Sequence, residues 1–135
     1  MTELRIVETV LRFYPEVQAI YLFGSYGTEY ETPGSDVDLA LLLPHALAHQ
    51  AGNLAMSNCW RELLDVTGRA VDLVNLRLVD TVFQNRVVET GRLILDSDTL
   101  AAQTFEMLTV SFYQKLQQER ALILDQIVQT KRILL

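Results

Sequence analysis

Apolar residues recur along this chain with the spacing of amphipathic helices in several separate stretches. Residues 2–14 carry them three and four positions apart, which predicts a helix that ends at Pro15. The same spacing predicts helices over Leu54–Val66 and from Asp80, as N-cap, through Val88. It continues from about Thr99 to Ile133, which predicts one long C-terminal helix.

Between these stretches lie short apolar runs that are typical of buried strands. The predicted strands are Val17–Phe23, Asp36–Leu43, Ala70–Leu76 and Leu93–Leu95. The polar segment Ser25–Thr32 is predicted to hold a short helix before Pro33 and Gly34 break it. Helices and strands that alternate in this way indicate an α/β (α+β) fold, a small mixed β-sheet covered by helices. The order of the strands in the sheet does not follow from the sequence.

The composition bears on the number of domains, on membrane insertion and on the cellular compartment. With 135 residues, half of them apolar, we expect a single domain over residues 1–135 with a substantial core. We find no apolar run long enough to span a membrane and no N-terminal secretion signal. Cys59 is the one cysteine, so no internal disulfide is possible, which favours a reducing compartment. We therefore expect a soluble, cytoplasmic protein.

The charge balance bears on the kind of partner. The net charge is −6, and the 11 basic residues are scattered along the chain. A nucleic-acid surface normally needs clustered Lys and Arg, so we expect no direct nucleic-acid binding. An acidic protein more readily meets a basic protein partner.

Asp36 and Asp38 are the first candidates for chemistry. Side chains on a strand repeat every two residues, so both carboxylates are expected on one face, close enough to share a hard cation. Their mutual repulsion and partial burial would be relieved by Mg²⁺. The alternative is a pair of exposed residues at the start of a strand, or helix caps, with no metal role.

Gly24 and Ser25 supply a second element at the end of the preceding strand. Glycine allows the backbone to approach a ligand closely, and a helical turn beginning near Ser25 would direct N–H groups at a phosphate. Ten residues, Tyr26 to Ser35, separate this pair from Asp36. A phosphate-binding turn beside paired metal carboxylates is the minimum equipment for nucleotidyl transfer.

The sequence Gly-Ser, ten residues, then Asp-x-Asp resembles the signature of the DNA polymerase β-like nucleotidyltransferases. The chain is similar in length to their smallest branch, the minimal nucleotidyltransferase antitoxins, and the resemblance covers roughly residues 17–96. It implies that fold, with a third aspartate on a later strand, which Asp72 matches. It also implies that Gly24 and Ser25 bind ATP phosphates and that Asp36, Asp38 and Asp72 are catalytic and bind two Mg²⁺ ions.

The resemblance further implies a function. In that branch the enzyme is a protein adenylyltransferase, an antitoxin that transfers AMP from ATP to a tyrosine of a partner HEPN-domain toxin ribonuclease and neutralises it. One alternative is a small-molecule nucleotidyltransferase of the aminoglycoside-modifying kind. Another is an antitoxin that acts by binding alone. The chain departs from many relatives because Tyr26–Ser35 contains no Lys or Arg, which leaves phosphate charge to metals, backbone N–H groups or a distant arginine.

Other residues carry competing interpretations. Asp72 could instead be a structural carboxylate paired with Arg69 or Arg77, and Arg77 could bind phosphate or form a surface ion pair. His45 and His49 are spaced i, i+4, but two histidines without a third ligand are a weak zinc signal. Cys59 is expected to pack in the core. The distal half of the last helix is expected to contact a partner.

Overall fold

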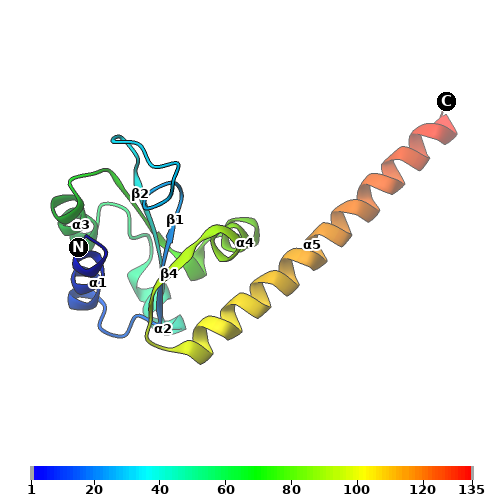
Figure 1. Cartoon of the computed structure of the whole chain (residues 1–135). Coiled ribbons are helices and arrows are strands. Elements are labelled where there is room, and N and C mark those ends of the chain that lie inside the picture. Colours follow the sequence, from blue (N-terminus) through cyan, green and yellow to red (C-terminus); the bar gives the residue numbers. More distant parts are fainter. Residues whose placement is uncertain (1, 135) are drawn as a thin grey trace.

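The computed structural model describes residues 2–134 of the chain, with side-chain surroundings through residue 132. Figure 1 shows a small sheet with helices on both faces and one long helix that projects away from it. The elements in chain order are α1 (Thr2–Phe13), β1 (Ala19–Phe23), β2 (Val37–Leu42), α2 (His45–Ala51), α3 (Asn58–Thr67), β3 (Val71–Asn75), the 3₁₀ turn η1 (Leu76–Leu78), α4 (Thr81–Thr90), β4 (Arg92–Asp96) and α5 (Thr99–Leu134).

The strands form a mixed sheet in the order β3-β2-β1-β4. β1 is antiparallel to both β2 and β4, whereas β2 and β3 run parallel. In this register Asp38 on β2 lies opposite Phe23 at the end of β1 and opposite Asp72 on β3. The predicted fold class is therefore confirmed, and the sheet supplies the strand order that the sequence left open.

Each face of the sheet has its own apolar layer. α1 and α3 cover one face, where Ile6 and Val10 are completely buried and pack with Leu39 of β2. α4 and the first turns of α5 cover the other, where Phe105 packs with the group that includes Ala40 of β2. Figure 1 shows these two pairs of helices on opposite sides of the strands. Because side chains alternate along β2, Asp38 shares the α4/α5 face with Ala40.

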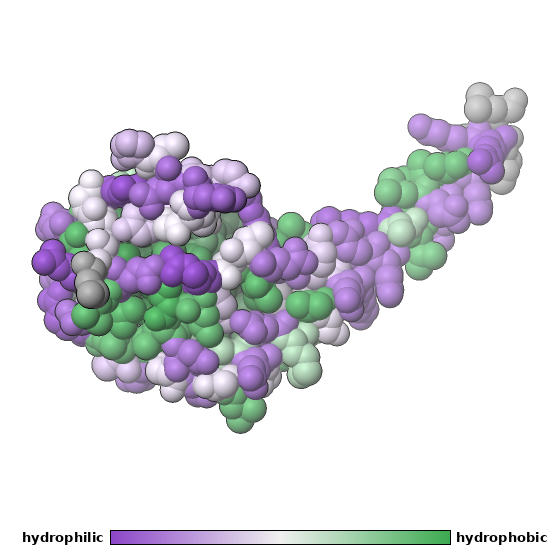
Figure 2. Space-filling view, viewed as in Figure 1, coloured by the Kyte–Doolittle hydropathy of each residue, from purple (hydrophilic) through white to green (hydrophobic). Residues whose placement is uncertain are grey.

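Only the beginning of α5 packs on this core. Ala102, Phe105 and Thr109 are buried, whereas every described side chain from residue 117 to residue 132 is exposed. Most helices in proteins owe their stability to a packed apolar face. The distal half of α5 therefore presents an unpartnered helix, and Figure 2 shows apolar side chains along it among polar ones.

The predicted helix over Ser25–Thr32 is wrong. The segment forms successive turns in which Thr28 N–H donates to Ser25 O at 3.0 Å and Glu31 N–H donates to Thr28 O at 3.1 Å. The Thr28 hydroxyl also donates to Ser25 O, at 2.6 Å, and accepts from Tyr30 N–H. Side-chain bonds of this kind compete with helical ones, and Gly27 adopts φ +78°, which a helix does not allow.

Two further differences concern α2 and α3. α2 was not predicted, because Pro44 indicated only the end of a strand. In the structure Pro44 also occupies the N-cap of α2, where its carbonyl accepts a hydrogen bond from Ala48 N–H. α3 begins at Asn58 rather than Leu54, since the Ser57 side chain caps it by accepting from Trp60 N–H at 3.1 Å. Leu54 is nevertheless buried, as its apolar character predicted.

Cys59 on α3 is buried in the core layer that α3 shares with α1, which confirms its predicted core position. Burial raises the pKa of its thiol to about 12. Within residues 2–134, none of the helices combines the length and apolar character needed to cross a membrane.

Candidate active site

The sheet brings Asp36, Asp38 and Asp72 to one region of the α4/α5 face. Asp38 and Asp72 are directly paired across the parallel strands β2 and β3, which lie about 4.8 Å apart in any such sheet. Asp36 immediately precedes β2, two residues before Asp38. Asp36 and Asp72 are exposed and Asp38 is half-buried. The three carboxylates thus open onto solvent at the end of the sheet where β1 ends and β2 begins.

Electrostatics single out Asp38 within this group. Burial raises the pKa of the Asp38 carboxyl above its ordinary value, and the neighbouring carboxylates of Asp72 and Asp36 raise it further. The guanidinium of Arg86 on α4 acts in the opposite direction and lowers the same pKa. Desolvation and repulsion therefore both destabilise the negative charge of Asp38. A bound cation would stabilise that charge.

Gly24 is required at the end of β1 by two independent features. Its φ is +76°, a conformation that side chains with a Cβ disfavour. A Cβ at this position would also lie 2.1 Å from Oδ2 of Asp38. The backbone of Gly24 therefore lies directly against the Asp38 carboxylate, so that the predicted phosphate-binding pair and the predicted metal carboxylates share one site.

Ser25 lies beside Gly24 at the start of the turn-rich loop. Its hydroxyl is hydrogen-bonded to the Ser35 hydroxyl at 3.1 Å, which links the two ends of the ten-residue segment. The Ser35 hydroxyl in turn accepts from Thr32 N–H at 2.8 Å. Since no helix begins at Ser25, any phosphate binding there depends on the hydroxyl and on loop N–H groups rather than on a helix N-terminus.

Arg69, in the connection between α3 and β3, holds this loop in place by side-chain contacts. It forms an ion pair with Glu31 at 3.1 Å, donates to the carbonyls of Thr32 and Ser35, and lies over the ring of Tyr26 at 4.9 Å. The positively charged guanidinium of Arg69 therefore makes its contacts with this loop. The alternative in which Asp72 pairs with Arg69 is wrong for the described structure, where Asp72 has no ion-pair partner.

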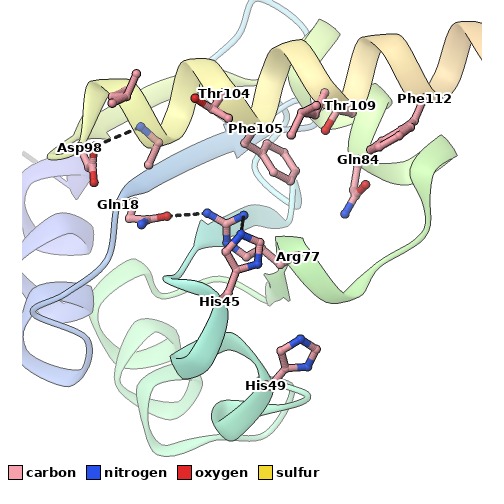
Figure 3. A pocket seen from close by; sticks show the side chains of 13 residues that line it. Gln18, His45, His49, Arg77, Gln84, Asp98, Thr104, Phe105, Thr109 and Phe112 are labelled. Carbon is pink, nitrogen blue, oxygen red and sulfur yellow. Dashed lines mark hydrogen bonds between the residues drawn. The ribbon is translucent and has the colours of Figure 1, made fainter.

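Arg77 lies at the opposite end of the sheet. It donates to Leu43 O and, at 2.7 Å, to Gln18 Oε1, and its Nη1 is 3.2 Å from His45 Nε2 (Figure 3). Burial lowers the pKa of its guanidinium. Both interpretations of Arg77, as a phosphate ligand of this site and as a surface ion pair, are therefore wrong. It joins the residue before β1, the residue after β2 and the start of α2, and its guanidinium lies over the ring of Phe105.

The two histidines of α2 also lie at that far end, where they line a cavity beneath α5 (Figure 3). Among residues 2–134, no three His, Cys, Asp or Glu side chains converge closely enough to enclose a metal ion by themselves. Asp36, Asp38 and Asp72 are likewise not clustered closely enough in residues 2–134 to hold an ion as three protein ligands at once.

Arg86 is the residue that the sequence did not reveal. It lies on α4, one turn after Phe83, whose ring packs edge-on against Phe23 at a centroid distance of 5.7 Å. This packing fixes α4 beside the end of β1 and brings a positive charge toward Asp38. The positive charge near Asp38 thus comes from α4 and not from the loop Tyr26–Ser35. No spacing in the sequence could have indicated it.

Comparison with known proteins identifies the family of this chain. The polymerase beta nucleotidyltransferase family model matches residues 6–100. The protein adenylyltransferase MntA of Shewanella oneidensis is 33% identical over 128 residues, which span 95% of this chain and 88% of that protein.

Two solved structures of toxin–antitoxin complexes are similar to this chain in both sequence and fold. A crystal structure of a toxin–antitoxin complex with AMP-PNP superimposes with a TM-score of 0.78 at 33% identity, covering 95% of this chain and 99% of the other. In a structure of the tri-AMPylated S. oneidensis HEPN toxin with its MNT antitoxin, the TM-score is 0.73 at 33% identity, with coverage of 94% and 96%. The family predicted from the Gly-Ser and Asp-x-Asp signature is confirmed: the chain belongs to the polymerase beta nucleotidyltransferases.

Proposed function

We propose that this protein is an adenylyltransferase antitoxin that transfers AMP from ATP to a tyrosine of a HEPN-domain toxin and thereby neutralises it. One observation carries the proposal: Gly24–Ser25 and the aspartates Asp36, Asp38 and Asp72 meet at one exposed end of the sheet. The similarity to MntA and to toxin–antitoxin complexes, over nearly the whole chain, supports the choice of reaction and partner. The cytoplasm, with its ATP supply, is the compartment we propose.

The donor set fits Mg²⁺. This ion is usually held by one or two carboxylates together with substrate phosphates and waters, rather than by a cage made only of protein. The paired carboxylates Asp38 and Asp72, with Asp38 facing repulsion and desolvation, match that description. Asp36, Asp38 and Asp72 would hold two ions, which would neutralise phosphate charge and polarise the attacking oxygen.

The residues around these carboxylates have complementary tasks. The backbone at Gly24 and the Ser25 hydroxyl position the triphosphate, and Arg86 contributes positive charge from α4. The phenol oxygen of the acceptor tyrosine forms a bond to the α-phosphorus of ATP, and the bond from that phosphorus to the bridging oxygen breaks. Pyrophosphate leaves, and the phenol proton passes to Asp72 and then to solvent.

The test of this function is direct labelling. The protein, Mg²⁺ and ATP carrying a labelled α-phosphate are mixed with a HEPN toxin partner. We expect the label on a tyrosine of the toxin and release of unlabelled pyrophosphate, as read by autoradiography and peptide mass spectrometry. If the toxin is neutralised without label, the protein acts by binding alone. Label on a small-molecule acceptor but not on the toxin would indicate the aminoglycoside-type alternative.

Nucleotide and metal are expected to bind cooperatively. Each lacks part of its contacts without the other, so ATP with Mg²⁺ should raise the melting temperature more than either alone. At a ligand concentration about 100 times Kd, the free energy of unfolding should rise by about 2.7 kcal/mol. Thermal unfolding with ATP, Mg²⁺, both or neither measures this. Equal shifts for ATP with and without metal would contradict metal binding by the aspartates.

The distal half of α5 is expected to hold the toxin. Ile123 and Ile127 are about half exposed on one side of a helix whose side chains from residue 117 to residue 132 are all exposed. Ile123→Glu with Ile127→Glu should weaken the complex at least about tenfold, because each change places a charge in an apolar contact. AMP-PNP affinity should stay unchanged. Isothermal titration with toxin and with nucleotide measures the two quantities.

A matched control uses the opposite side of the same helix. At 100° per residue, Gln118 and Gln129 lie roughly opposite the two isoleucines. Gln118→Glu with Gln129→Glu adds the same two charges but should leave toxin affinity nearly unaltered. Equal weakening by both pairs would mean that net charge, rather than an apolar contact surface, governs the complex.

A further inference from the structure

A groove lies next to Asp72 at the free edge of the sheet, on the side of β3 away from β2. Its volume is about 480 Å³, within the range of sites that hold small molecules or single side chains. It is lined by Gly52, Asn53, Ala55, Asp72, Leu73, Val74, Asn75, Leu78 and Val79. We propose that this groove receives the ring of the acceptor tyrosine and presents its hydroxyl at Asp72. The inference rests on the proposed function and deepens it.

The order of the strands determines which side of the site the acceptor must use. Gly24 and Ser25 follow β1, Asp38 lies on the central β2, and Asp72 lies on β3. Phosphoryl transfer places the attacking and leaving oxygens roughly in line, on opposite sides of the phosphorus. With the leaving pyrophosphate held on the β1 side by Gly24 and Ser25, the attacking oxygen must enter from the β3 side. The groove is the cavity that opens there.

The lining suits an aromatic ring with a polar tip. Val74, Leu78 and Val79 supply apolar wall, and Asp72 at the same groove supplies a carboxylate that accepts a phenol proton. A serine or threonine acceptor would leave this wall without contact. The groove therefore favours a tyrosine over shorter hydroxyl side chains.

Asn75 positions one wall of the groove. Its side-chain amide donates to Ala48 O and Gly52 O, both at 2.9 Å, which determines which amide atom is the oxygen. These two bonds hold the C-terminal end of α2 against β3, and Gly52 at that end lines the groove together with Asn75.

The test fills the groove without touching the proposed catalytic aspartates. Ala55 is exposed in the loop between α2 and α3, so Ala55→Trp should fold normally and occupy the groove. We expect KM for the toxin in the AMP-transfer reaction to rise at least about tenfold. The affinity for AMP-PNP with Mg²⁺ should stay unchanged. Ala46→Trp, the same change at an exposed alanine of α2 outside the groove, should leave both quantities as in the wild type.

A second variant tests the wall itself. Leu78 is 42% exposed, so Leu78→Ser removes groove surface at little cost to the core, and KM for the toxin should again rise with nucleotide affinity unaltered. Wild-type KM for the toxin in A55W and L78S would overturn the inference and leave the proposed function intact. Loss of AMP-PNP affinity in A55W would instead assign the groove to the nucleoside and overturn it as well. Absence of AMP transfer by the wild-type protein would overturn both proposals.

Discussion

Asp36→Asn combined with Asp38→Asn is expected to abolish AMP transfer, with a loss of about 10³-fold or more, because metal ions contribute several kcal/mol of charge stabilisation to such reactions. The substitutions keep the shape of the side chains and remove the negative charge that would hold the ions. Single-turnover transfer from labelled ATP to saturating toxin measures the loss. Full activity of the double variant in the presence of Mg²⁺ would refute the two-metal site.

The same double variant should remain folded. Asp38 is half-buried, and its charge is opposed by desolvation and by Asp72 and Asp36, so the free energy of unfolding without ligand should be equal to or higher than that of the wild type. Chemical denaturation with circular dichroism measures this. Glu16→Gln with Asp65→Asn, two exposed acids away from the site, is the matched control and should retain full transfer. A fall in stability confined to the site variant would mean that the carboxylates have a structural role.

Asp72→Asn is expected to reduce transfer by about 10²-fold or more while the affinity for the toxin stays nearly unchanged. The phenol of tyrosine has an ordinary pKa near 10, so little of it is ionised at neutral pH, and its attack needs a proton acceptor. Asp72 is exposed and forms no ion pair in the described structure, so its removal should cost little stability. Parallel measurements of toxin affinity and of the single-turnover rate separate binding from catalysis.

Two controls distinguish the possible roles of Asp72. If it accepts the phenol proton, the deficit of Asp72→Asn should shrink as the pH rises toward the phenol pKa, because more of the acceptor is then already ionised. If it only holds a metal ion, the rate should recover with excess Mg²⁺ at constant pH. A normal rate with saturating toxin at neutral pH would show that Asp72 has neither role.

The sequence alone determined the local structure wherever the apolar period was regular. The helices at both ends of the chain and the four strands lie close to their predicted positions, because a two- or 3.6-residue period selects one element type. It also predicted that Asp36 and Asp38 share a face, from strand alternation; in the structure Asp38 lies on β2 and Asp36 immediately precedes that strand. The spacing from Gly24 and Ser25 to these aspartates, together with the later aspartate Asp72, predicted the family that the comparison confirms.

Predictions from local sequence were wrong where side-chain hydrogen bonds or a single capping residue determine the backbone conformation. The segment Ser25–Thr32 forms turns because Thr28 and its neighbours bond to nearby backbone groups, an outcome that propensity does not distinguish from a short helix. α2 was missed because a proline that ends a strand can also begin a helix. The start of α3 was set by one serine cap at Ser57.

Everything that assembles the site across the chain was decided by the tertiary structure. Asp72 lies beside Asp38 only because β2 and β3 pair in parallel in this register, and a shift by one residue would place it on the opposite face. The contact of Gly24 with Asp38 and the approach of Arg86 likewise join elements far apart in sequence. Sequence periodicity specifies which face a residue occupies, but only packing and strand pairing specify which residues from other elements meet it there.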